Sequence, residues 1–505
     1  MKVRILATSD IHGTIMPYSY SDLKPCDHGF LKLKAKMDEY TTDNTLKIDN
    51  GDILEGSPFL TYHYKFNQDA PNPMIDLMND ANYDYINIGN HDLNYGQDNL
   101  FSYLNGLKAK CICGNILYKG QAIGCDYHIH KFNDKYSIAI IGVVTHYLKN
   151  WEREINLKDI EVLEAFEYVR DTVKLIKEKE KVNGIVVVYH GGFEKDLQTG
   201  IPTEALTGEN EAYRMCEMID GIDIVISGHQ HRSIATTIFN KHVTQTAYKA
   251  SEIAMIDWDL DTNEISESLL KADSENYIVP DKIKELENKV EVWLDEKVAK
   301  VCDANLKVED EFDTRLHKHP VISFINNVQK EVSGAMLSGN ALFNGAVGFN
   351  DVITTRDIVS TYVYPNTLVV FEITGKILKE YLEKSAEYFD IEDGKIVVSK
   401  KYREPKPQHY NYDMVDGIEY TIKVSNEIGH RIIELYYQGN KVKEDDIFTL
   451  VVSNYRAAGG GNYFMFKEAK IIKDIQVDMV SLISDYLAIH KELYVNHQDN
   501  IKVII

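Results

Sequence analysis

The sequence has few cysteines and lacks a long hydrophobic run. Its 505 residues include six Cys, which are scattered and form no paired C-x-x-C sets. This usage disfavours a disulfide scaffold and favours free or buried thiols in a reducing compartment. The apolar stretch before Thr8 is too short for a secretory signal, and no apolar run approaches the ~20 residues of a transmembrane helix. The sequence as written predicts a cytoplasmic protein with no membrane partner.

Proline, glycine and positive charge are also scarce. The chain has 11 Pro and 30 Gly, with 44% hydrophobic and 26% charged residues, which excludes the disordered and fibrous classes. Lys and Arg number 55 against 78 Asp and Glu, so the formal net charge is −23. This excess of negative charge disfavours nucleic-acid polymers and anionic membranes as partners. An anionic substrate must therefore meet a local positive charge.

The length predicts two or more domains, and the first half of the chain has a repeating texture. Short runs of Val, Ile and Leu alternate with Gly-containing loops and longer helical stretches, which is typical of an α/β sheet. The predicted strands cover residues 3–7, 45–48, 84–88, 137–144, 184–189 and 223–227. The predicted helices cover residues 30–40, 73–79, 162–180 and the charged stretch 280–300.

The second half of the chain has a different texture. An amphipathic helix is predicted over residues 317–333, because apolar residues recur at helical spacing there. From about residue 335 the chain has its own strands, helices and Gly-rich loops, including a final helix near 479–492. We therefore predict a second, smaller α/β domain in this part of the chain.

Potential metal ligands follow five of the predicted strands. The segments are SDIHG (9–13), NGD (50–52), GNHD (89–92), YHGG (189–192) and SGHQH (227–231). In an open α/β sheet, binding groups collect beyond the carboxyl ends of the strands, so these residues are expected to converge on one site. Carboxylates, an amide and several imidazoles suit Mn, Zn, Fe or Co better than Ca. Two metals can share the site if one carboxylate bridges them.

Each of these segments is weak evidence when taken alone. A single D-x-H occurs by chance, and a single buried His is more often a satisfied core residue. Five such segments in order, each after an apolar strand, are much harder to explain by packing. The set as a whole therefore favours a metal site.

The five segments resemble the pattern of the calcineurin-like metallophosphoesterases, which reads D-x-H, G-D, G-N-H-D/E, H and G-H-x-H. The resemblance covers residues 10–231 and implies a four-layer α/β sandwich domain. It also implies two divalent metal ions per chain, with Mn, Zn, Co and Fe as the candidate metals. One ion would be held by Asp10, His12, Asp52 and His231, and the other by Asp52, Asn90, His190 and His229. In this arrangement Asp52 would bridge the ions.

Catalytic roles are expected beside the ligand Asn90. Two cations can clamp phosphoryl oxygens and generate a nucleophile from water near neutral pH. His91 is then free to face the phosphate or to protonate the leaving oxygen. We group Asp92 and Asn94 with His91 as candidate catalytic residues.

The second half resembles the C-terminal domain of the 5′-nucleotidases, over residues 362–376 and 453–462. In that family two aromatic rings sandwich the nucleobase, and the matching positions are Tyr364 and Tyr455. Either Tyr alone would be read as ordinary packing without the neighbouring Gly-rich loop. The remaining candidate substrate-binding residues are Asn344, Asn366, Gly459 and Gly460. The resemblance implies a metallophosphoesterase domain at 1–318, a linker helix at 319–334 and a nucleotide-binding domain at 335–505.

Two departures from the 5′-nucleotidase pattern narrow the prediction. The arginine that usually grips the phosphate end is missing from segment 342–346, and Asn94 stands where the family usually has Asp. Both features, with segment 410–417, are similar to the branch of 2′,3′-cyclic-nucleotide 2′-phosphodiesterases and 3′-nucleotidases, which is our first choice. The alternatives are a 5′-nucleotidase, a nucleotide-sugar diphosphatase and a catalytically silent nucleotide-binding sensor. The oligomeric state stays open.

Overall fold

The computed structural model describes residues 1–204, 206–364, 366–404, 406–475 and 477–505. The chain divides into two compact units, Met1–Val290 and Glu291–Ile505. The division falls within helix α7 (Asp281–Leu294). Each unit is mixed α/β, as the sequence predicts.

Unit 1 is built on two six-stranded sheets. The first has the order β15 (Glu264–Lys271), β14 (Glu252–Asp259), β1 (Lys2–Thr8), β2 (Thr45–Asp49), β3 (Tyr85–Ile86) and β4 (Lys110–Cys111). The second has the order β12 (Ile234–Ile238), β13 (Lys241–Gln245), β11 (Ile224–Ser227), β10 (Gly184–His190), β8 (Ser137–Val144) and β7 (His128–Lys131). A small third sheet contains β6 (Gln121–Ala122), β5 (Ile116–Tyr118) and β9 (Ile160–Val162).

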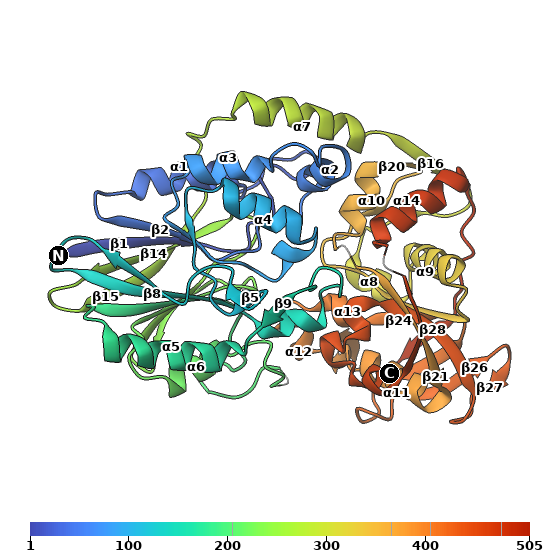
Figure 1. Cartoon of the computed structure of the whole chain (residues 1–505). Helices are drawn as coiled ribbons and strands as arrows, with labels where there is room; N and C mark the ends of the chain where they lie inside the picture. The colour runs from blue at the N-terminus through green and yellow to red at the C-terminus, as the bar shows by residue number, and fades with distance from the viewer. Residues whose placement is uncertain (205, 365, 405, 476) are drawn as a thin grey trace. The chain divides into compact units, whose positions relative to one another are not determined.

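Helices cover the outer faces of the two large sheets (Figure 1). One layer contains α1 (Phe30–Tyr40), α2 (Pro58–Phe66), α3 (Pro73–Asp80) and α4 (Gln97–Gly106). The opposite layer contains α5 (Ala165–Lys179) and α6 (Ala212–Met218). The order of helices, sheet, sheet and helices confirms the predicted four-layer sandwich.

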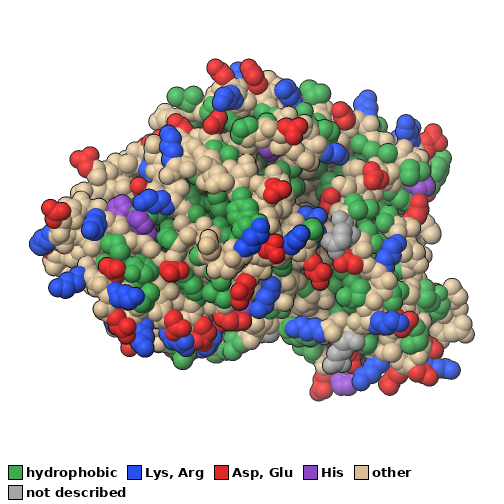
Figure 2. All heavy atoms as spheres, in the orientation of Figure 1, with side chains coloured by type: hydrophobic (Ala, Val, Ile, Leu, Met, Phe, Trp, Pro, Cys, Tyr) green, Lys and Arg blue, Asp and Glu red, His purple; other side chains and the backbone are tan. Residues whose placement is uncertain are grey.

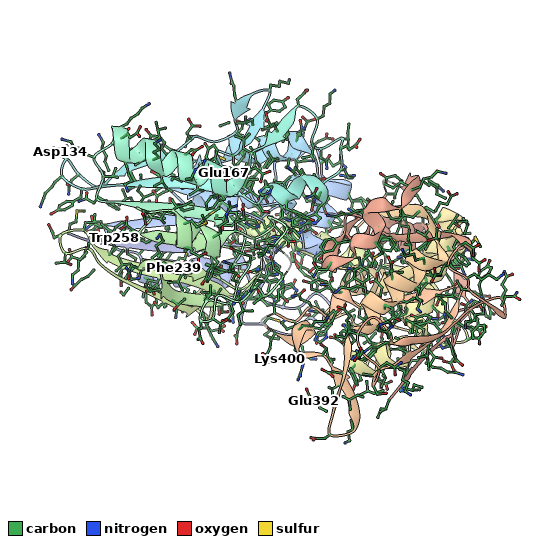
Figure 3. The ribbon with its side chains drawn as sticks, turned by 90° about the horizontal axis from the view of Figure 1, so that it is seen from below. Asp134, Glu167, Phe239, Trp258, Glu392 and Lys400 are labelled. Atoms are coloured by element: carbon green, nitrogen blue, oxygen red, sulfur yellow. The ribbon has the colours of Figure 1, made fainter. Side chains whose placement is uncertain are left out.

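The central strands β8, β10 and β11 are buried on both faces, which explains their continuous hydrophobic runs. Along β10, Val186 and Val188 pack between the two sheets, whereas Ile185 and Val187 pack against α5 and α6. Figure 3 shows Trp258 of β14 within unit 1, and this side chain is 1% exposed. Strands β1, β2, β3 and β4 are parallel to one another in the first sheet, and β8, β10, β11 and β13 are parallel to one another in the second. The ends of the two sets meet, because Asn50 after β2 donates to Tyr189 O of β10 at 3.0 Å. Their carboxyl ends therefore gather the loops that carry the predicted ligands.

Unit 2 has a five-stranded main sheet. Its order is β24 (Asp413–Asp416), β18 (Leu337–Ala341), β28 (Ile447–Ser453), β21 (Leu368–Thr374) and β29 (Lys470–Ile475). The smaller sheets contain β16 (Lys297–Val301), β17 (Leu306–Lys307), β19 (Gly348–Phe349), β20 (Val352–Thr354), β22 (Phe389–Glu392), β23 (Lys395–Val398), β25 (Glu419–Lys423), β26 (Ile432–Tyr437), β27 (Asn440–Lys441), β30 (Glu492–Leu493) and β31 (Ile501–Ile504). The helices are α8 (Glu311–Leu316), α9 (Pro320–Ser333), α10 (Thr355–Thr361), α11 (Gly375–Ala386), α12 (Lys400–Arg403), α13 (Asn454–Ala457) and α14 (Met479–Ile489).

Helix α9 differs from its expected place. The segment 319–334 was expected to link the two domains, with a boundary near residue 318, whereas the compact units divide at residue 290. Helix α9 lies inside unit 2, because Val321, Phe324 and Val328 belong to the same buried cluster as the main sheet. The helix ends at Ser333 as predicted but begins at Pro320, three residues after the predicted start. Pro320 lies in its first turn, and Gly334 follows it in the left-handed conformation.

Among the described residues, none of the helices combines the length and hydrophobicity that a membrane span requires. On the face that Figure 2 shows, Asp and Glu side chains lie interspersed with Lys and Arg. The positive side chains on this face are therefore interrupted by negative ones.

Candidate functional site

The loops after β1 and β2 run side by side beyond the edge of the sheet. Asp10 N donates to Gly51 O at 2.9 Å, and His12 N donates to Asp52 O at 2.8 Å. Gly51 has φ 91°, and a Cβ there would lie 2.2 Å from the backbone N of Gly89. Only glycine allows this approach, so the G-D and G-N-H segments meet as the predicted motif requires.

Five of the seven predicted ligands have a left-handed backbone conformation. This region is uncommon for residues other than glycine. The φ values are 56° for Asp10, 50° for His12, 58° for Asp52, 68° for His229 and 56° for His231. The sharp turns at these positions direct both members of each D-x-H or H-x-H pair toward one point.

The first predicted ligand group converges closely. Asp10 Oδ1 lies 3.3 Å from His231 Nε2, and His231 Nε2 lies 3.2 Å from His12 Nε2. Asp52 Oδ2 lies 3.9 Å from His12 Nε2. The ligand atoms of Asp10, His12 and His231 all lie within 4.8 Å of one another, so the three side chains could hold a metal ion.

The second group adjoins the first through Asp52. His190 Nε2 lies 3.1 Å from Asp52 Oδ2 and 3.9 Å from Asp10 Oδ1, and these three side chains also have ligand atoms within 4.8 Å. His229 Nδ1 lies 2.8 Å from Asn90 Oδ1. The rings of His190 and His229 are 5.8 Å apart, measured between centroids. Asp52 therefore reaches ring nitrogens on both sides, as a bridging carboxylate must.

The hydrogen bonds of the histidines fit a divalent cation. His190 donates its Nδ1–H to the carbonyl oxygen of Asn50 at 2.6 Å, and His12 Nδ1 lies 3.0 Å from the carbonyl oxygen of Glu55. A carbonyl only accepts, so in the neutral rings each Nε2 has a lone pair. These lone pairs face carboxylate oxygens and one another, which is favourable around a cation, and histidine ligands of metals characteristically make such outer hydrogen bonds.

The carboxylates of Asp10 and Asp52 make the group of predicted ligands strongly negative. Burial lowers the pKa of His190, but the charges of Asp52 and Asp10 outweigh burial and raise it to about 10. Burial likewise lowers the pKa of His12, whereas its hydrogen bond with Glu55 and the charge of Asp52 raise it to about 9. The field that holds protons on these rings also attracts divalent cations, so metal binding displaces protons.

Asp92 has a different place from the one expected. We expected this residue among the catalytic group, but its oxygens accept hydrogen bonds at 2.8–2.9 Å from the backbone N–H groups of Asp52, Ile53, Leu54 and Gly89. It is 4% exposed. A carboxylate saturated by four backbone donors holds the loop of Asp52 in place and presents no free oxygen to a substrate.

His91 and Asn94 are brought together in the 3₁₀ turn η1 (His91–Leu93). His91 Nδ1 lies 2.7 Å from Asn94 Oδ1, and 28% of the His91 side chain is exposed. Glu55 Oε2 lies farther from His91 Nδ1, at 3.6 Å. The predicted replacement of the usual Asp by Asn94 thus preserves an acceptor for His91.

Several residues around the site were missed by sequence reasoning. Glu209 Oε1 lies 3.2 Å from His229 Nε2. Trp151 stacks on His229 with centroids 5.4 Å apart, and Tyr248 stacks on His231 at 4.8 Å. They come from loops without a motif, so no local sequence signal singles them out.

In unit 2, strand pairing gathers the predicted base-binding residues. β21 and β28 are antiparallel, with Leu368 opposite Ser453, so the segment before β21 and the segment after β28 emerge at the same end of the sheet. Asn454 N donates to Thr367 O at 2.9 Å. Tyr364 and Asn366 therefore lie on a segment adjacent to Tyr455. Pro365 lies outside the described residues.

The supports of the two tyrosines differ. Tyr364 contacts Phe343 edge-on, with centroids 5.2 Å apart. A Cβ at Gly460 would lie 2.6 Å from the ring of Tyr455, so the absence of a side chain there makes room for that ring. Asn344 is exposed and donates to the carbonyl oxygen of Pro407 at 3.0 Å. Gly459 has φ 91° and turns the loop after α13.

Comparison with known proteins gives a consistent result. Residues 3–233 match the family described as calcineurin-like phosphoesterase, and residues 299–468 match the 5′-nucleotidase C-terminal domain. A crystal structure of a candidate 5′-nucleotidase from Staphylococcus aureus is 33% identical, with a TM-score of 0.93 over 100% of both chains.

Two curated relatives are more distant. The trifunctional nucleotide phosphoesterase protein YfkN of Bacillus subtilis is 26% identical over 96% of this chain, which spans 37% of that protein. The 2′,3′-cyclic-nucleotide 2′-phosphodiesterase/3′-nucleotidase of Haemophilus influenzae is 24% identical over 96% of this chain and 85% of that protein. Together with the site geometry, these similarities show that the chain belongs to the 5′-nucleotidase family of calcineurin-like metallophosphoesterases, which are hydrolases of phosphoester bonds.

Proposed function

We propose that the chain hydrolyses phosphoester bonds of small nucleotides with two divalent metal ions, as a 2′,3′-cyclic-nucleotide 2′-phosphodiesterase and 3′-nucleotidase. The observation that carries this proposal is the convergence of the predicted ligands around Asp52, which reaches His190 Nε2 at 3.1 Å and His12 Nε2 at 3.9 Å. The branch is supported by Asn94 in place of Asp and by the name of the Haemophilus relative.

The proposed ligand sets keep the division expected from the sequence. One ion is assigned to Asp10, His12, Asp52 and His231, and the other to Asp52, Asn90, His190 and His229. When bound, the ions polarise the phosphoryl oxygens and activate water near neutral pH. Nitrogen and oxygen donors favour Mn, Zn, Co or Fe.

His91 is proposed to act on the leaving group. Its Nδ1–H is donated to Asn94 Oδ1 at 2.7 Å, so its Nε2 is the atom available to substrate. The donor is the imidazolium form of the ring, which carries a hydrogen on both nitrogens. As the bond between phosphorus and the leaving oxygen breaks, the Nε2 proton passes to that oxygen, which therefore does not leave as a costly alkoxide, and the ring becomes the neutral Nδ1–H form.

The base is proposed to bind in unit 2. Tyr364 and Tyr455 would stack on it, which is worth about 1 to 3 kcal/mol per stacked base. Asn366 would contact its edge, and Gly459 and Gly460 would let the backbone approach. This assignment is supported by the pairing of β21 with β28, which gathers these segments at one end of the sheet.

The main alternative is a 5′-nucleotidase, which is favoured by the name of the Staphylococcus structure. A nucleotide-sugar diphosphatase is a further alternative with the same metal chemistry. These possibilities differ in which phosphorus–oxygen bond of the substrate is hydrolysed. A comparison of substrates therefore separates them.

The test is a panel of 3′-AMP, 5′-AMP, 2′,3′-cyclic AMP and a nucleotide sugar, each assayed with Mn, Co, Zn and Mg. We expect the highest kcat/KM with 2′,3′-cyclic AMP and 3′-AMP, and loss of activity on chelation. A preference for 5′-AMP or for the nucleotide sugar would select the corresponding alternative. Background turnover of every substrate with every metal would favour a silent nucleotide-binding sensor.

The base-binding assignment has its own test. Tyr364→Ala and Tyr455→Ala should each lower kcat/KM for nucleotides by about 5-fold to 100-fold, as expected for one stacked ring. Both variants should spare bis(p-nitrophenyl) phosphate, which has no base to stack. Equal losses on both substrates would count against the assignment.

A further inference from the structure

The side chain of Asn94 joins His91 to a buried carboxylate. Asn94 Oδ1 lies 2.7 Å from His91 Nδ1, and Asn94 Nδ2 donates to Glu152 Oε2 at 2.7 Å. The two ends of an amide are not equivalent, because the oxygen only accepts and the nitrogen only donates. An ionised Glu152 only accepts, so it must face the Asn94 nitrogen. The Asn94 oxygen then faces His91, whose Nδ1 must carry the hydrogen.

Glu152 is itself held in place. It is 8% exposed, and its other oxygen, Oε1, accepts from Arg153 N and from Asn156 Nδ2, both at 2.8 Å. Arg153 also donates a guanidinium N–H to the backbone oxygen of Asn94 at 2.7 Å. The Glu152 carboxylate therefore has a fixed position, with one oxygen saturated and the other directed at Asn94.

The pairing explains why an amide occupies position 94. An Asp at this position would place a second carboxylate about where the Asn94 amide nitrogen now lies, 2.7 Å from Glu152 Oε2. Two carboxylates at such a distance cannot both stay ionised without a large cost. A neutral side chain with one donor and one acceptor satisfies both neighbours.

The other carboxylate near His91 is a weaker partner. Glu55 Oε2 lies 3.6 Å from His91 Nδ1 and 3.7 Å from His12 Nδ1. Both distances exceed the range of a normal hydrogen bond, whereas the contact between His91 and Asn94 lies within it. Asn94 is therefore the group that sets the orientation of the His91 ring.

We propose that Glu152 is a positioning residue for the leaving-group step. Through the amide of Asn94 it keeps His91 with Nδ1–H directed inward and Nε2 directed at the leaving oxygen. This inference rests on the proposed function, because it assigns a supporting residue to the same reaction. Removing a residue that orients a functional histidine through hydrogen bonds typically changes activity by about 10-fold to 100-fold.

The test exchanges the carboxylate at position 152 and the amide at position 94. Glu152→Gln places an NH₂ group either against the donors Arg153 N and Asn156 Nδ2 or against Asn94, and Asn94→Asp creates the carboxylate pair. Each single change should lower kcat for 3′-AMP by about 10-fold to 100-fold with little change in KM. The double variant should recover to within a few-fold of wild type, because the carboxylate introduced at position 94 then accepts both from His91 and from the amide introduced at position 152.

The leaving group separates positioning from a merely structural effect. p-Nitrophenolate leaves without protonation, so each single variant should hydrolyse bis(p-nitrophenyl) phosphate within about 3-fold of wild type. The matched control is Glu154→Gln, an exposed carboxylate two residues away, which should behave as wild type on both substrates. Equal losses on both substrates, or additive losses in the double variant, would overturn the proposal.

A readout without turnover keeps this inference distinct from the proposed function. With ¹⁵N-labelled histidine, the His91 ring, assigned by its loss in His91→Gln, should show the Nδ1–H form in wild type. In Glu152→Gln the ring should show the Nε2–H form or a mixture of the two forms. In the double variant the Nδ1–H form should return. If wild type hydrolyses no phosphoester but the ring responds in this way, the positioning role stands and the proposed function fails. An unchanged His91 signal in Glu152→Gln would overturn the positioning role.

Discussion

At the scale of single residues, the predicted metal ligands combine backbone strain with buried charge. Asp52 has φ 58° and is 1% exposed, and left-handed conformations of this kind cost of the order of 1–3 kcal/mol each. The surrounding contacts must compensate for this cost. Three backbone hydrogen bonds to Asp92, from Asp52, Ile53 and Leu54, hold the loop of Asp52 in its conformation.

The position of Asp52 between two groups of nitrogens predicts a ranking of variants. Asp52→Asn keeps the shape of the side chain and removes its charge from both proposed metal positions. We expect kcat for 3′-AMP to fall about 100-fold or more, and to fall further than in His231→Asn, which affects one position only. Metal content should be measured alongside. Near wild-type kcat in Asp52→Asn, with both metals retained, would contradict the bridging role.

Asp49, at the end of β2, predicts a pH dependence of stability. Burial raises its pKa to about 8, whereas an unfolded Asp has a pKa of about 4. Between these values the folded chain binds the proton and the unfolded chain does not, so the free energy of unfolding decreases as pH rises. The slope from one such group is at most about 1.4 kcal/mol per pH unit.

Asp49→Asn should remove this contribution. The amide has the shape of the protonated acid, so it can still accept from Gly51 N–H and contact the Thr8 hydroxyl. We expect the variant to be more stable than wild type at pH 8 and to differ less at pH 5, in thermal unfolding at matched metal concentration. A difference between the two proteins that does not depend on pH would show that Asp49 is ionised in the folded state.

At the scale of elements, the short helix α13 and the glycine loop after it act together. Tyr455 lies on α13, and Gly460 leaves the space that its ring fills. The next residue, Arg456, is buried and paired with Asp413 at 2.8 Å, which anchors the helix to β24. The ring of Tyr455 is therefore held by its neighbours in sequence and by one ion pair beneath it.

Gly460→Ala tests this arrangement. The new methyl group would lie 2.6 Å from the Tyr455 ring and must displace it. We expect KM for nucleotides to rise several-fold, while kcat/KM for bis(p-nitrophenyl) phosphate stays near wild type. Gly439→Ala is the control for a general loss of stability, because φ 77° makes this substitution strained although its Cβ would meet no atom within 4 Å. It should not change KM. An unchanged KM in Gly460→Ala would argue against Tyr455 as a base-binding residue.

At the scale of the whole molecule, each unit has its own core. Unit 1 contains a buried cluster between its two large sheets and another beneath α5 and α6. Unit 2 contains a large buried cluster around its main sheet. A unit with a separate core is expected to fold by itself. The proposed metal ligands all lie in unit 1, and the proposed base-binding residues all lie in unit 2.

A fragment covering residues 1–294, which ends with α7, should therefore fold and bind metal. We expect it to hydrolyse bis(p-nitrophenyl) phosphate but to lose at least 10-fold in kcat/KM for 3′-AMP, because the proposed stacking residues are absent. Metal analysis, thermal unfolding and assays with both substrates check this. Retention of wild-type kcat/KM for 3′-AMP would show that unit 2 does not contribute to nucleotide recognition.

The local pattern of the chain was enough to predict much of the fold and the composition of the site. The helix over 30–40 and the strand over 137–144 were predicted with the bounds that the structure has, because hydrophobic periodicity is a property of neighbouring residues. The five segments that carry the seven proposed ligands were predicted to converge because each follows a strand, and parallel strands bring their ends together. The resemblance to the metallophosphoesterases then implied the individual ligands.

Long-range contacts decided the rest. In the sequence Asp92 was a candidate catalytic residue, and only the approach of four backbone N–H groups from two loops indicates a supporting role. Glu152 has no motif and lies 58 residues from Asn94, so its role depends on how the loops meet. Helix α9 was correctly predicted as a helix, but its place inside unit 2 follows from which surface its apolar face packs against. The residue types and their local spacing follow from the sequence. The partners of each side chain depend on how segments that are distant in the sequence pack together.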